Sequence, residues 1–160
     1  STNEASQRLA ADAVCHVTNP EAVATLVGLV ANTTFLPPDD PFRAGAYNAL
    51  ASIGTVAAVD VLFKDAAIEQ NRDRTSILEA IGLVNNEDSI ELLIAHASGK
   101  AGVDDPEIQA AAIRALGNYG VQEDRVRQLL LDIAGYKNSP AVIGAANRTL
   151  RILSGIDPSE

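Results

Sequence analysis

One apolar position recurs along the chain at a nearly constant interval, and this repeat constrains the fold more than any other feature. The position lies near the end of five similar segments, and successive copies are 36, 31, 35 and 34 residues apart. The residues at this position are Val14, Leu50, Ile81, Leu116 and Leu150. Intervals of this length are typical of stacked helical hairpins, in which each repeat buries its apolar stripe only against its neighbours. The sequence therefore predicts an all-α solenoid.

The repeat unit is most complete between residues 105 and 135. Asp105 and Pro106 suit the N-cap and the first position of a helix, and apolar residues follow at helical spacing as far as Tyr119. Gly120 is placed to end this helix. A second helix then begins with acidic residues, which the helix dipole favours, and it carries its own apolar stripe. Each repeat is therefore expected to be an antiparallel pair of helices.

We expect a single domain, residues 1–160, that contains four such pairs and one last helix. The pairs are predicted at residues 3–32, 40–70, 71–98 and 105–135, and the last helix at 139–154. Asp40 is predicted to cap the second pair, and Gly54 to end its first helix. Asn86 is predicted to cap the second helix of the third pair.

The composition limits the classes of function. The net charge is −9, which argues against nucleic-acid binding because that binding depends on Lys and Arg side chains that neutralise phosphates. No apolar run is long enough to span a membrane, and no targeting signal is recognised, so we expect a soluble protein and leave its compartment open. The complete lack of Met favours a processed or excised chain.

Few residues could carry chemistry. Cys15 is the only cysteine, which excludes an internal disulfide, and His16 and His96 are the only histidines. Cys15 and His16 are adjacent, so they project from different sides of a helix and do not form a metal site. No serine stands in a nucleophile motif beside a base. We therefore expect no catalytic residue, no metal ion and no cofactor.

The basic residues gather near the C-terminal end. This cluster consists of Arg125, Arg127, Arg148 and Arg151. We interpret it as part of solvated helix faces, because acidic residues at 123, 124 and 132 offset its charge.

Two of the predicted first helices resemble the first helix of a HEAT repeat, of the bacterial type that also occurs in phycobilin lyases. They read DDPFRAGAYNALASIG, which ends at Gly54, and DDPEIQAAAIRALGNYG, which ends at Gly120. Both combine an Asp-Pro start with an Ala-Leu pair near the end. The resemblance departs at residues 71–74, where Asn-Arg-Asp-Arg replaces the Asp-Pro start, and in the first repeat, which lacks the final glycine.

This resemblance implies a right-handed α–α solenoid whose second helices line a concave surface that binds other proteins. Such scaffolds carry many functions, so the family implies no single activity. We therefore expect a non-catalytic, bacterial interaction scaffold with a protein or peptide as its partner. Two alternatives stay open: a phycobilin lyase-like or cofactor-chaperone activity, and a structural spacer within a larger protein.

The predicted contact surface lies on the second helices, at positions that flank the core stripe. Its residues are Leu29, Val61, Leu92, His96 and Leu131, joined by Phe35 and Leu36 from the connection between the first two pairs. Apolar residues at such spacing are typical anchors for a partner helix. The alternative is that the residues on the second helices pack against neighbouring second helices, and that the connection with Phe35 and Leu36 folds back to cover the first repeat.

The C-terminal edge forms a further candidate surface because the last predicted helix has no second helix after it. Its apolar residues are Val142, Ile143, Leu150 and Leu153. A helical stack normally ends in a polar cap. An apolar outer face here would imply either further repeats or self-association.

Overall fold

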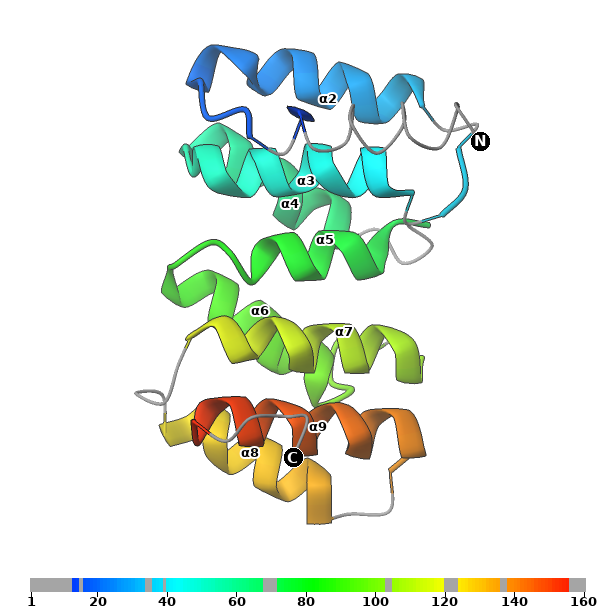
Figure 1. Ribbon diagram of the computed structural model, residues 1–160, viewed down its shortest axis with the longest axis vertical. Helices are drawn as coiled ribbons and strands as arrows, with labels where there is room; N and C mark the ends of the chain where they lie inside the picture. The colour runs from blue at the N-terminus through cyan, green and yellow to red at the C-terminus, as the bar shows by residue number, and fades with distance from the viewer. Residues whose placement is uncertain are drawn as a thin grey trace. The chain divides into compact units, whose positions relative to one another are not determined.

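The computed structural model describes residues 13–14, 16–33, 36–38, 40–67, 72–102, 105–119, 124–135 and 138–155. This part of the chain contains eight α-helices, two short 3-10 helices and no strand (Figure 1). The helices form two compact units that divide between Val84 and Asn85. Within each unit, successive helices pack as in a helical repeat solenoid, which confirms the predicted fold class.

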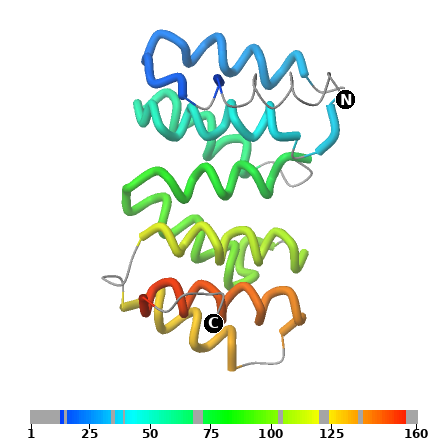
Figure 2. The backbone as a smooth tube through the Cα atoms, viewed as in Figure 1, coloured from blue at the N-terminus to red at the C-terminus, as the bar shows by residue number. Residues whose placement is uncertain are grey.

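The first unit is built from α2 to α5. Its elements are the 3-10 helix Pro20–Ala22, α2 (Val23–Asn32), α3 (Pro41–Ile53), α4 (Val56–Ala66) and α5 (Arg74–Ile81). Helix α3 packs against α2, α4 and α5, and α4 also packs against α5. In the view of Figure 2, α4 lies behind α3 and α5. The core between them contains Leu50, Leu62 and Ile77, all with no exposed surface.

Local signals in the sequence set the helix ends of the first unit. Asp40 caps α3, because its carboxylate accepts a hydrogen bond from the Phe42 N–H at 2.9 Å. Gly54 ends α3 in the left-handed conformation, with φ +63°, as predicted. Thr55 follows at once and caps α4 through a 3.4 Å hydrogen bond to its hydroxyl from the Ala58 N–H.

The second unit is built from α6 to α9. Its elements are α6 (Glu87–Ala97), α7 (Pro106–Leu116), the 3-10 helix Gly117–Tyr119, α8 (Asp124–Gly135) and α9 (Pro140–Leu153). Helix α7 packs against α6 and α9, and α8 packs against α9. Both α7 and α9 bury several small residues, which favour close approach of neighbouring helices. These buried residues are Ala111, Ala112, Ala115, Ala145 and Ala146.

Side-chain caps also begin the helices of the second unit. The Asn86 side chain accepts a hydrogen bond from the Ser89 N–H at 2.8 Å, which confirms the predicted cap of α6. Asp105 accepts from the Glu107 N–H at 2.8 Å, and Ser139 accepts from the Val142 N–H at 3.3 Å. These bonds satisfy N–H groups that have no partner within the helix.

Helix α7 is shorter than predicted. It ends at Leu116 and a 3-10 turn takes over as far as Tyr119, whereas the sequence pattern predicts one continuous helix. Gly120, the predicted end of that helix, lies outside the described residues. So do Cys15, Phe35 and residues 3–12 of the first predicted pair.

Candidate functional site

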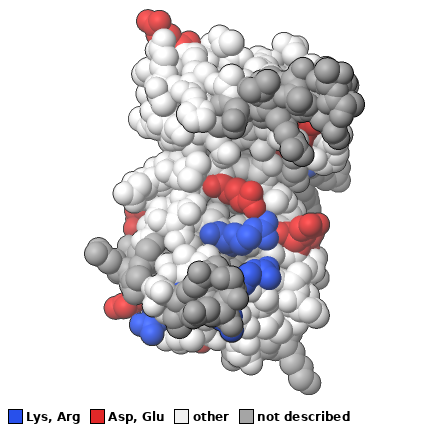
Figure 3. Space-filling model, viewed as in Figure 1, with Lys and Arg blue, Asp and Glu red and all other residues white. Residues whose placement is uncertain are grey.

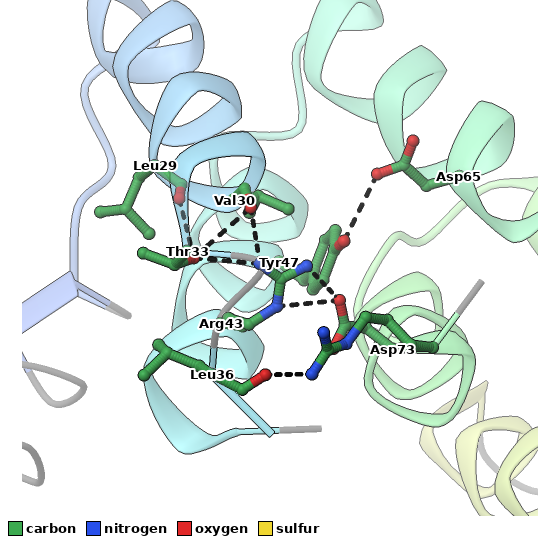
Figure 4. Close-up of polar contacts among 9 residues, drawn as sticks. Leu29, Val30, Thr33, Leu36, Arg43, Tyr47, Asp65 and Asp73 are labelled. Carbon is green, nitrogen blue, oxygen red and sulfur yellow. Dashed lines mark hydrogen bonds and ion pairs between the residues drawn. The ribbon is translucent and has the colours of Figure 1, made fainter. Parts of the chain in front are cut away.

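The most polar cluster of the first unit is buried and holds helices together (Figure 4). Arg43 on α3 is 3% exposed, and Asp73, directly before α5, is 0% exposed. The Arg43 Nε donates to Asp73 Oδ2 at 2.9 Å, and Nη2 forms an ion pair with the same oxygen. Nη1 donates to the Val30 carbonyl at 2.6 Å and to Thr33 Oγ1 at 3.0 Å, both near the end of α2. One guanidinium therefore joins three helices.

Electrostatics at this cluster follow from burial and from these hydrogen bonds. The hydrogen bonds that Arg43 donates to Asp73 raise the pKa of the guanidinium. Burial raises the pKa of the Tyr47 phenol above its ordinary value and also raises the pKa of the Asp65 carboxyl. The Tyr47 hydroxyl donates to Asp65 Oδ2 at 3.4 Å. Because both members of the ion pair are enclosed, the cluster stabilises the unit and offers no access to a substrate.

The predicted contact residues of the first unit lie on neighbouring second helices. Leu29 on α2 and Val61 on α4 are both half-buried, and α2 packs against α4. Leu36 is half-buried as well, and its carbonyl accepts a hydrogen bond from Arg72 Nη2. The connection that contains Leu36 is thereby tied to the residues before α5.

The predicted contact residues of the second unit differ in exposure. Leu131 on α8 is 48% exposed, and Leu92 on α6 is half-buried. His96 is only 7% exposed, and its Nδ1 lies 2.8 Å from the Leu92 carbonyl oxygen. The ring of His96 therefore offers little surface to a partner. The reason is that α6 packs against α7 over a stripe wide enough to include Ser89 and His96.

A charged bridge links the two second helices of this unit. Arg125 on α8 lies 2.7 Å from Glu87 and 2.6 Å from Glu91, both on α6. All three side chains are exposed, so the bridge adds little to stability, on the order of 1 kcal/mol or less. The sequence pattern did not reveal this bridge, although Glu87 and Glu91 stand one helical turn apart.

Helical phase separates the exposed residues of α8 into two flanks. Arg125 meets α6, as its ion pairs show. Arg127 and Leu131 stand four residues apart, so they share one flank, which differs from that of Arg125. Leu131 therefore points away from the ion pairs of Arg125 and lies on the same flank of α8 as Arg127.

Basic side chains collect on one face of the second unit. Figure 3 shows Lys and Arg side chains gathered in the part of the view that holds α7 and α9. The exposed arginines of these two helices are Arg114, Arg148 and Arg151.

In the described part of the chain, no group of three or more His, Cys, Asp or Glu side chains is placed to hold a metal ion. None of the described helices combines the length and the apolar character needed to cross a membrane.

Comparison with known families decides the class of this architecture. A family model for HEAT repeats matches residues 67–151, which is more than half of the chain. The chain belongs to the HEAT-repeat family. HEAT repeats are commonly protein-interaction scaffolds, and the fold is generally non-catalytic. The comparison with curated proteins gives no match for this HEAT-repeat chain.

Proposed function

We propose that this HEAT-repeat protein is a non-catalytic module that binds another protein along the exposed side of its second helices. The observation that carries this proposal is Leu131, which keeps 48% of its surface exposed on α8. Leu92 supplies a second apolar residue on α6, and Arg125 on α8 forms an ion pair with Glu87 on α6. Apolar anchors within a charged rim suit an amphipathic partner helix.

The first unit supports the same proposal through a similar arrangement. Leu29 and Val61 lie on α2 and α4, which are second helices that contact each other. Each unit therefore presents two apolar residues from two second helices. We propose that both pairs of apolar residues contact the partner. Leu36, in the connection between α2 and α3, would add a further contact.

Introducing a negative charge at the proposed contact surface tests the proposal. Leu92→Glu and Leu131→Glu place a carboxylate where an apolar anchor would bind, so we expect recovery of the partner to fall by at least about tenfold, which is 1.4 kcal/mol. Ile152→Glu is the matched control, because Ile152 is 55% exposed and lies on a first helix, α9. Equal recovery with all three variants would overturn the proposal.

The alternative of a phycobilin lyase-like activity, which requires binding of an open-chain pigment, has no structural observation in its favour that compares with exposed Leu131. Two hollows beside α9 have no aromatic side chain among the described residues that line them. An absorbance titration with a bilin tests this alternative directly, since binding of the pigment would shift its spectrum.

A further inference from the structure

A hollow opens between α8 and α9 on the second unit, away from the Arg125 bridge. It has a volume of about 510 Å³ and is lined by Arg127, Leu150, Leu153, Ser154 and Gly155. A second depression of about 430 Å³ is lined by Asn147, Leu150, Arg151 and Ser154. Because the two share Leu150 and Ser154, we treat them as one site, the α8–α9 hollow.

Apolar surface forms the floor of the α8–α9 hollow. Leu150 occupies the recurring apolar position of the repeat, which is fully buried at Leu50, Ile81 and Leu116. Leu150 itself is only half-buried. The side chain that packing encloses in the second, third and fourth repeats is therefore partly open to a ligand here.

Two arginines form the rim of the α8–α9 hollow. Arg127 comes from α8 and Arg151 from α9, and both are exposed. Among the described residues, no carboxylate pairs with either guanidinium, and none lines the hollow. Helix α9 carries two arginines and no acidic residue, in a chain whose net charge is −9. The site is thus locally basic on an acidic protein.

We propose that the α8–α9 hollow binds an acidic peptide segment of a partner protein. Carboxylates of the segment would bind Arg127 and Arg151, since a guanidinium matches a carboxylate with two parallel hydrogen bonds. One apolar side chain would cover Leu150 and Leu153. A short peptide fits better than a nucleic acid, because a long polyanion would also meet the negative charge of the rest of the chain.

The α8–α9 hollow uses none of the residues of the proposed contact surface, although Arg127 shares a flank of α8 with Leu131, so substitutions at Arg127 and Arg151 test it without changing either leucine. The probe is a fluorescein-labelled peptide in which glutamates flank one leucine, and binding to the whole chain is measured by fluorescence anisotropy. Arg127→Ala and Arg151→Ala should each weaken binding by about tenfold, the effect of one charge-assisted contact. Arg148→Ala is the matched control, because Arg148 is exposed on the same helix and lines neither depression.

Three further arms make the test decisive. A peptide with glutamine in place of glutamate should bind at least about tenfold more weakly, because the guanidinium pairs are lost. Competition by inorganic phosphate or by a single-stranded oligonucleotide at the peptide's own concentration would overturn the proposal, since the site would then bind any anion. An equal loss in the Arg148→Ala control, or the lack of saturable peptide binding, would also overturn it.

Discussion

Arg43 on α3 donates two hydrogen bonds to Asp73 at the start of α5, and neither side chain is accessible to solvent. Asp73 occupies the N-cap position of α5 but makes no side-chain cap bond there. Its carboxylate faces another helix instead. The departure from the Asp-Pro start at residues 71–74 therefore accompanies a long-range ion pair in place of a local cap.

The first prediction concerns this pair. Arg43→Ala or Asp73→Ala leaves one buried charge without its partner, so each should lower the free energy of unfolding of the first unit by about 3–5 kcal/mol. Chemical denaturation followed by circular dichroism measures the change. The double variant Arg43→Met/Asp73→Leu should recover much of the loss, because apolar residues of similar volume remove both charges.

Coupling between the two positions decides whether this account holds. If the double variant loses as much as the two single variants added together, the side chains act independently and the pair is not a structural bridge. Arg72→Ala is a useful comparison, because Arg72 is exposed and its Nη2 donates to the Leu36 carbonyl.

The second prediction concerns alkaline pH. Burial raises the pKa of Tyr119 to about 12 and raises that of Tyr47 as well. An unfolded phenol ionises near pH 10, so both groups stabilise the folded state below about pH 10, and this contribution is lost as the pH rises toward the folded pKa values. Phenolate absorbance at 295 nm should show a late phase that shrinks in Tyr47→Phe and Tyr119→Phe. Ionisation of both phenols near pH 10 in the folded protein would contradict the prediction.

The third prediction compares two glycines. Gly54 ends α3 with φ +63°, so Gly54→Ala should cost about 1 kcal/mol. Gly28 lies inside α2, and an added Cβ would meet nothing within 4 Å. Gly28→Ala should therefore stabilise the first unit by about 0.5–1 kcal/mol, because alanine favours the helix. Thermal denaturation of the two variants should shift the midpoint in opposite directions; a shift in the same direction would refute the assignment.

The fourth prediction concerns the start of α7. Asp105→Ala removes the hydrogen bond from the Glu107 N–H and should cost about 1 kcal/mol. Asp105→Asn keeps an acceptor oxygen in the same place and should retain most of the stability. Urea denaturation of the second unit compares the two. Equal losses would show that charge near the helix end matters more than the cap bond.

The sequence predicted those features that depend on neighbouring residues. The recurring apolar position predicted the all-helical repeat fold, and the caps at Asp40, Asn86 and Asp105 follow from residue type directly before an apolar run. Thr55 was missed, although a threonine between a helix-ending glycine and an apolar stretch is a cap signal.

Features that depend on contacts between residues far apart in the sequence could not be predicted from the local pattern. The Arg43–Asp73 pair joins residues 30 positions apart, and the bridge from Arg125 to Glu91 spans 34. The burial of His96 depends on how closely α7 packs, which helical phase alone does not give. The α8–α9 hollow likewise arises from packing, since no motif marks it in the sequence.

The most direct test of the proposed function is site-specific photo-crosslinking. A photoreactive residue is placed at Leu92 or Leu131 on the second helices, and at Ile152 on α9 as the control. The account predicts a partner adduct from Leu92 and Leu131 and none from Ile152. An adduct of equal yield from Ile152, or a retained partner that crosslinks at neither leucine, would contradict it.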